Sequence, residues 1–245
     1  LFTQLGQKIK GRKRLLKSGA TDKIFFFAGD SRTKEIYILA ANYLQTLDWR
    51  SDGEVMRNIV TFYTKAKAFE QLANFFDACS QVEIDEYRDY EKAAGALREA
   101  VATLGKARTL ENGSERLRQM QLKLDRVEAF VGARKVIKTD PDEALRTCEA
   151  LLNEHDLDAD VRVGDVFALL IEWYYMQQQY EAAYGCVEKM RTRGIELVHY
   201  LDVEMVAQLC STLGHPEPPE LAQGAGGANG YDQGEFVEEE LPDEG

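Results

Sequence analysis

The residue types that most often carry out chemistry in proteins are few in this sequence and widely spaced. The 245 residues include three histidines and four cysteines. They are His155, His199 and His215, and Cys79, Cys148, Cys186 and Cys210. No cysteines form a CxxC pair, and no histidines have the spacing of a helical metal pair, so the sequence indicates neither a zinc site nor a disulfide framework. We expect reduced, buried thiols, no catalytic centre, and no bound cofactor or metal.

One acidic segment begins like a calcium-binding loop. Asp156, Asp158 and Asp160 alternate as the first three ligands of such a loop do. The sixth position, which requires glycine, is Val161, and the twelfth, which requires a bidentate glutamate, is Phe167. The favoured interpretation is a solvated loop in which Asp160 caps the following helix.

The charged residues are unevenly distributed. The formal net charge is −12, and residues 194–245 carry 12 acidic and no basic side chains, so residues 1–193 are electrically balanced. A basic face along the whole chain is therefore absent, and we expect no nucleic-acid partner. The longest clean apolar runs, 166–171 and 24–28, are far shorter than the roughly 20 residues of a membrane-spanning helix, so no direct membrane insertion is expected.

Two charged segments could bind a partner. A basic run could meet an anionic surface or serve as a nuclear-import-like patch, although it could equally be a solvated helix face. An acidic segment with embedded apolar residues could dock in a groove and fold on binding, or it could serve only solubility. The candidate binding residues are Lys8, Lys10, Arg12, Lys13 and Arg14 in the basic run, and Phe236, Val237 and Leu241 in the acidic segment.

Helical spacing of apolar residues dominates residues 1–213. Only one proline precedes Pro216, and Ile36, Leu39, Ala40 and Tyr43 follow the i, i+3, i+4, i+7 pattern. Boundary residues predict helices over roughly 3–17, 22–29, 32–47, 54–65, 67–85, 89–107, 115–137, 141–154, 160–178, 180–193 and 202–213. The chain is therefore predicted to be all-α.

Cap-forming residues mark several of these helix boundaries. Asp52 and Ser114 are predicted N-caps, and Asp140 followed by Pro141 is the clearest helix start. Gly194 and Gly214 suit helix C-termini.

A repeated spacing joins three of the predicted helices. Each has a small or short side chain where two helices approach, followed by larger residues at matching positions. The matching sets are Tyr90, Ala93, Leu97 and Ala100; Pro141, Ala144, Cys148 and Leu151; and Tyr180, Ala183, Val187 and Met190. The spacing predicts a right-handed solenoid of antiparallel helical hairpins with degenerate tetratricopeptide-like repeats. The alternative is a non-repetitive bundle, which the long helices 115–137 and 160–178 would favour.

The composition changes abruptly after Leu213. Residues 214–245 are rich in glycine, proline and acidic side chains, which favours a mobile tail that is dispensable for folding. The predicted organisation is a solenoid over 1–213 and this tail. The chain begins with Leu1 inside a helical pattern, so we expect it to be the end of a longer solenoid in a parent protein.

Three stretches carry a resemblance to a known family. They are KSGATDKIFFFAGDSRTKEIYILAANYLQTLDWR, FYTKAKAFEQLANFFDACSQVEIDEYRDYEKAAGALREA and RVGDVFALLIEWYYMQQQYEAAY. They resemble the C-terminal part of the intraflagellar transport protein 140 family, whose members are subunits of intraflagellar transport complex A. The resemblance implies a parent with N-terminal β-propellers and a long tetratricopeptide-like solenoid. It also implies a role in retrograde transport and in the entry of membrane receptors into cilia. The family has no catalytic residues that could be assigned to positions of this sequence.

The expected function is therefore a non-enzymatic scaffold that offers extended surfaces to other complex A subunits, and possible further partners are membrane-protein cargo or adaptors. The expected location is the cilium or flagellum, the basal body and the cytoplasm. The alternative is a receptor that captures the peptide tails of cargo in the concave groove. A hydrolase hidden among the helices has no support in the sequence.

Overall fold

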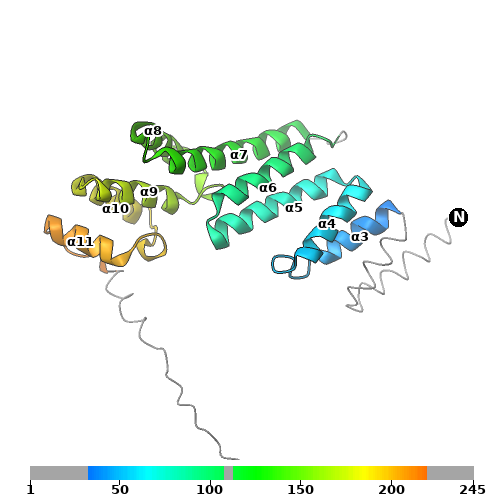
Figure 1. The fold of residues 1–245 in the computed structure, drawn as a ribbon, viewed down its shortest axis with the longest axis horizontal. Coiled ribbons are helices and arrows are strands. Elements are labelled where there is room, and N and C mark those ends of the chain that lie inside the picture. The colour runs from blue at the N-terminus through cyan, green and yellow to red at the C-terminus, as the bar shows by residue number, and fades with distance from the viewer. Residues whose placement is uncertain (1–32, 108–112, 220–245) are drawn as a thin grey trace, which may run out of the picture.

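The computed structural model describes residues 33–107 and 113–219 (Figure 1). The predicted helices over 3–17 and 22–29 lie outside the described residues. So do all eight candidate binding residues named above: Lys8, Lys10, Arg12, Lys13, Arg14, Phe236, Val237 and Leu241.

The described residues form nine α-helices and no strand, which confirms the predicted all-α class. The α-helices are α3 (Lys34–Leu44), α4 (Gly53–Ala66), α5 (Phe69–Val82), α6 (Tyr90–Leu104), α7 (Gly113–Val136), α8 (Pro141–Leu152), α9 (Val163–Met176), α10 (Tyr180–Thr192) and α11 (Val203–Leu213). A π-helical turn, η1 (Glu83–Tyr87), follows α5, and two 3₁₀ turns, η2 (Leu157–Ala159) and η3 (Leu197–His199), precede α9 and α11.

Side-chain caps fix several helix starts as the sequence predicts. The Asp52 carboxylate accepts from the backbone N–H of Glu54 at 2.8 Å, and that of Asp140 accepts from Glu143 at 3.1 Å. Each cap satisfies a free first-turn amide and is worth about 1 kcal/mol. The prediction for Ser114 is wrong: α7 begins at Gly113, so Ser114 lies within its first turn.

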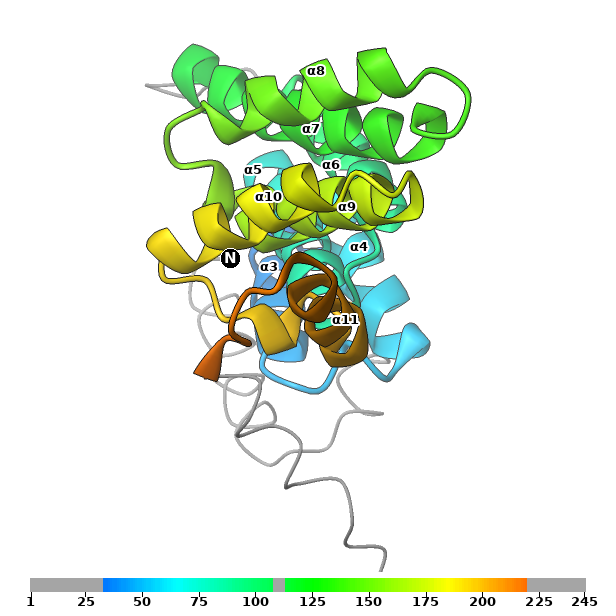
Figure 2. The ribbon, with the colours of Figure 1, turned by 90° about the vertical axis from the view of Figure 1, so that its left-hand side faces the viewer.

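The helices pack as consecutive antiparallel pairs along an arc: α3 with α4, α5 with α6, α7 with α8, and α9 with α10 (Figure 1). Helix α11 packs against α10 at the end of the series. A view at right angles shows α7 and α8, then α9 and α10, then α11 as successive layers (Figure 2). This arrangement is a helical repeat solenoid and not the alternative bundle.

Alanine allows the close approach of helices in each of the last three pairs. Ala93, Ala144 and Ala183 are completely buried, and they occupy the position that the repeat spacing assigned to a small residue. A larger side chain there would separate the two helices of a pair. These residues confirm that the spacing in the sequence reports repeated hairpins.

A polar ladder joins α7 to α5, the first helices of neighbouring pairs. Arg116 pairs with Glu70. One heptad further along both helices, Lys123 Nζ lies 2.7 Å from Asp77 Oδ1 and 3.0 Å from Gln81 Oε1. Both ion pairs join residues that are 46 positions apart. The 24-residue α7 therefore lies along α5 with two ion pairs that have the same sequence offset and are one heptad apart.

The chain stays in contact with the solenoid after α11. The imidazole ring of His215 stacks on Tyr184, with centroids 4.3 Å apart and an interplanar angle of 10°, and Pro218 is buried. The predicted tail begins at residue 214, but His215 within it packs against Tyr184 of α10.

Candidate protein-interaction site

A hydrogen bond links the second pair of helices directly to the fourth. Tyr90, the first residue of α6, donates from its hydroxyl to Asp165 Oδ2 in the first turn of α9 at 2.6 Å. The same hydroxyl accepts from the backbone N–H of Arg162 at 3.2 Å. Tyr90 is 1% exposed, and its ring meets Phe130 of α7 edge-on at 4.7 Å between centroids. The Tyr90 side chain thus links its own pair, the second, to both the third and the fourth pair.

The turn between α5 and α6 places a cation beside this bond. Asp89 N–H donates to Glu83 O at 2.9 Å across the π-helical turn, and Arg88 adopts the left-handed conformation with φ 51°. The Arg88 guanidinium lies 3.3 Å from Asp165 Oδ1, and it also donates to the backbone carbonyl of His199. Its carbon Cζ lies 4.5 Å from the centre of the Tyr200 ring. Arg88 therefore connects the turn before α6 with α9 and η3.

Gly164 makes room for the Tyr200 ring. A Cβ atom at position 164 would lie 2.4–2.5 Å from three ring atoms of Tyr200, a distance that packed side chains do not adopt. The absence of a side chain at Gly164 is therefore what lets Tyr200 lie against α9 and under Arg88.

Two adjoining hollows open beside this cluster, and we call them together the inner groove. One has a volume of about 190 Å³ and the other about 430 Å³, and Arg88, Tyr90 and Arg134 line both. Glu172 also lines the smaller hollow, and Tyr87 and Lys135 also line the larger one. Tyr87 is 62% exposed, which makes it the most exposed large hydrophobic side chain in the described part of the chain.

Burial shapes the electrostatics of the inner groove. Desolvation raises the pKa of Asp165, although the Tyr90 hydroxyl and the nearby arginines, Arg88 first, act in the opposite direction. Desolvation also raises the pKa of Glu172, which Arg134 opposes. The pKa of Tyr90 is raised by burial and by the Asp165 charge, so its hydroxyl keeps its proton and can donate it. Tyr90 therefore remains a donor to Asp165, while the exposed side chains of Tyr87, Arg88 and Arg134 are the parts of the groove that a bound chain can reach.

Burial determines the state of the cysteines. All four cysteines are free and buried, and burial raises the pKa of Cys79 and of Cys148 to about 12, which keeps these thiols protonated. The exposed His199 lies with Nδ1 3.3 Å from Glu196 Oε2.

Among residues 33–107 and 113–219 no group of three potential ligands could hold a metal ion. In the same ranges no helix combines the length and the apolar character needed to cross a bilayer.

The acidic loop before α9 is structural, but its cap differs from the one expected. Asp158 Oδ1, and not Asp160, accepts from Val163 N–H at 2.9 Å. Asp160 instead binds Arg126, whose guanidinium lies 2.6 Å from Asp160 Oδ2 and 2.6 Å from Glu154 Oε2. The prediction that Asp160 caps the helix is wrong, because Arg126 of α7 reaches across and takes that carboxylate.

Sequence reasoning did not find the residues of the inner groove. In the sequence Tyr90 is notable only as the first position of a repeated spacing. Arg88, Arg134 and Asp165 belong to no recognised motif. Their one signal was indirect: a tyrosine that starts a helix and is fully buried must find a partner for its hydroxyl.

The arc of helix pairs, with fully buried alanines between paired helices and an open inner groove, defines a tetratricopeptide-repeat protein-interaction domain. Two family models match the chain. The C-terminal tetratricopeptide-repeat domain of intraflagellar transport protein 140 matches residues 70–191. The tetratricopeptide-repeat domain shared by intraflagellar transport proteins 140 and 172 matches residues 1–62. The chain therefore belongs to the intraflagellar transport protein 140 family, and it is a ciliary protein-interaction module of that transport system.

Proposed function

We propose that the chain is a non-enzymatic scaffold of intraflagellar transport complex A. In this role it supports assembly of the complex, retrograde ciliary transport and the entry of membrane cargo into cilia. Its partners are other complex A subunits, together with membrane-protein cargo or adaptors, at the cilium or flagellum, the basal body and in the cytoplasm. The family match supports the transport system, and the fold supports binding as the mechanism.

The observation that carries the proposal is the bond between Tyr90 and Asp165. In a simple solenoid each pair of helices contacts only its neighbours, so the array bends easily. Here the second and fourth pairs are joined directly, and Arg88 adds an ion pair to the same carboxylate. A solenoid whose curvature is held in this way loses less conformational freedom on binding, which suits a scaffold that must present fixed surfaces to several subunits.

The inner groove supports a second candidate function, a receptor for the peptide tails of cargo. It is open, it contains the exposed Tyr87 ring, and its exposed Arg134 and Lys135 side chains could donate hydrogen bonds to an extended chain. In this function the groove would bind a peptide directly, whereas a scaffold could dock on any exposed face of the solenoid.

One set of experiments tests the scaffold and separates it from the receptor. The 245-residue chain is tested for co-purification with purified complex A subunits and, separately, for binding to arrays of cargo-tail peptides. The groove variant combines Tyr87→Ala with Lys135→Ala, and its matched control combines two exposed residues elsewhere, Met176→Ala with Lys138→Ala. Subunit binding by the wild-type chain with no peptide retained supports the scaffold. Peptides retained by the control but not by the groove variant, without subunit binding, would establish the receptor instead.

A further inference from the structure

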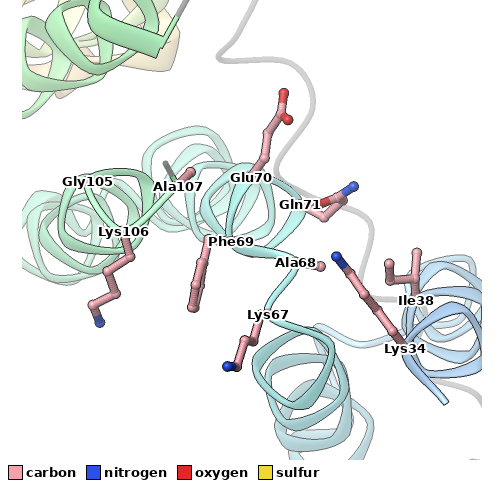
Figure 3. A pocket seen from close by; sticks show the side chains of 10 residues that line it. All are labelled: Lys34, Ile38, Lys67, Ala68, Phe69, Glu70, Gln71, Gly105, Lys106 and Ala107. Carbon is pink, nitrogen blue, oxygen red and sulfur yellow. The ribbon is translucent and has the colours of Figure 1, made fainter. Parts of the chain in front are cut away.

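A large hollow in the described residues lies at the edge of the solenoid, away from the inner groove. Its volume is about 830 Å³, within the range of about 300–1,000 Å³ that is usual for ligand sites. It lies where the start of α3, the connection between α4 and α5, and the end of α6 meet (Figure 3). We call it the edge groove, and its lining includes Lys34, Ile38, Lys67, Phe69 and Lys106.

Three lysines from separate elements line the edge groove. Lys34 extends from α3 towards Ala68, while Lys67 and Lys106 lie on either side of the Phe69 ring (Figure 3). All three lysines are exposed. None of them forms an ion pair within 4.0 Å with another residue of 33–107 or 113–219. Most other cations on these helices have a carboxylate partner, so this cluster of positive charge is available to a ligand.

The acidic residue at the edge groove is already neutralised. Glu70 is the one carboxylate among the described lining residues, and it pairs with Arg116 of α7. Asn74 also accepts from the Arg116 guanidinium at 2.7 Å, which holds that arginine on the α5 surface. The net charge that the edge groove presents is therefore positive.

The backbone fixes the position of the central lysine. Lys67 has φ 51°, and the backbone N–H of Lys67 and of Ala68 donate to Thr64 O at 3.0 Å and Tyr63 O at 2.9 Å. This left-handed helix end turns the chain sharply from α4 into α5. It brings Lys67 next to the half-buried Phe69 and places an aromatic surface between cations.

We propose that the edge groove binds an acidic, extended peptide segment of a partner protein, with an apolar side chain of that segment on Phe69 and Ile38. The inference rests on the proposed scaffold function and names the chemistry of one partner. Three lysine ammonium groups around a hollow can each attract one of several carboxylates spaced along a short peptide. The apolar side chains of Phe69 and Ile38 add contact area. A flat anionic membrane surface would instead require the cations to lie on an exposed plane.

Fluorescence anisotropy with the whole 245-residue chain tests the proposal. The probe is a short fluorescein-labelled peptide of glutamates around a single phenylalanine, and its control replaces every glutamate by glutamine. The groove variant is Lys34→Gln, Lys67→Gln and Lys106→Gln combined. The matched variant, Lys92→Gln, Lys138→Gln and Lys189→Gln, removes the same charge from exposed positions elsewhere. We expect the groove variant to weaken binding roughly tenfold or more, the matched variant to bind as the wild type does, and added salt to weaken binding.

Several results would overturn the proposal: equal affinity of the two lysine variants, equal binding of the glutamine peptide, or capture of anionic vesicles in place of the peptide through the same lysines. Co-purification with complex A subunits is measured on the same preparations. A wild-type chain that binds subunits but not the acidic peptide overturns this inference and leaves the scaffold function in place. A chain that binds the peptide through the three lysines but binds no subunit supports the edge groove and counts against the assembly role.

Discussion

Tyr90 and Asp165 are separated by 75 positions in the chain and by a complete pair of helices in the fold, yet their side chains are joined at 2.6 Å. The bond joins the second pair of helices to the fourth. It also brings the Arg88 turn and the Tyr200 ring into one cluster, so changes at these residues should act on the curvature of the solenoid as well as on its stability.

Tyr90→Phe removes the donor to Asp165 but keeps the ring against Phe130. We expect a loss of about 1–2 kcal/mol in the free energy of unfolding, because a largely buried carboxylate loses its hydrogen bond. Chemical denaturation measures the change. Tyr87→Phe is the control, since that ring is exposed, and its effect should be near zero. If both variants unfold alike, the bond contributes nothing to stability.

The raised pKa of Asp165 predicts a pH dependence. The folded protein holds a proton on this carboxyl more tightly than the unfolded chain, whose ordinary pKa is 3.8. The contribution of Asp165 to stability is therefore greatest below that value and is lost as pH rises through the folded pKa. The stability advantage of the wild type over Asp165→Asn should shrink as pH is raised through this window. Denaturation curves at a series of pH values test this, and an advantage that grew with pH would show that the arginines outweigh burial.

Gly164→Ala should disturb the Tyr200 contact. The new methyl group would meet the ring at 2.4–2.5 Å, so we expect destabilisation of about 1–3 kcal/mol as Tyr200 and Arg88 shift. Gly185→Ala in α10 is the matched control, because a Cβ there meets nothing within 4 Å, and it should stabilise the helix by up to about 1 kcal/mol. In a Tyr200→Ala background the cost of Gly164→Ala should disappear. A cost that persists there would mean that Tyr200 is not the obstacle.

Ala183→Leu tests the close approach of α9 and α10. Ala183 is completely buried whereas its neighbour Ala182 is exposed, so the same substitution at the two positions separates packing from helix propensity. We expect Ala183→Leu to lower stability by about 1–3 kcal/mol or more, and Ala182→Leu to change it by less than about 0.5 kcal/mol. Thermal melts followed by circular dichroism measure both, and similar melting temperatures would contradict the repeat assignment.

Two truncations test where the solenoid ends. Removal of residues 220–245 should leave the melting temperature unchanged. Removal of residues 215–245 should lower it by a few degrees, because the stack of His215 on Tyr184 and the buried Pro218 are lost, together worth about 1 kcal/mol. Equal melting temperatures for the two truncations would place the boundary at 214, as the composition of the sequence suggests.

The pairs of helices were predictable because they are made by short-range patterns. Asp140 with Pro141 marks a helix start within three residues, and the alanines at 144 and 183 recur at the same place in their hairpins. The inner groove was not predictable, because it depends on the rotation of each helix pair relative to the preceding pair. That rotation brings Tyr90 to Asp165 across an intervening pair, and the spacing of apolar residues within either segment does not indicate its size. The edge groove is hidden for the same reason, since its three lysines converge from three separate elements.

The ladder between α5 and α7 has a consequence for how this array tolerates change. Because Arg116 with Glu70 and Lys123 with Asp77 repeat the same offset one heptad apart, these side chains set the longitudinal alignment of the two helices independently of the peptide that links α6 to α7. Insertion or removal of residues in that link should therefore leave the third pair in its place on the second. A shift of α7 by one helical turn would separate both cations from their partners at once, so the two ion pairs together oppose such a shift.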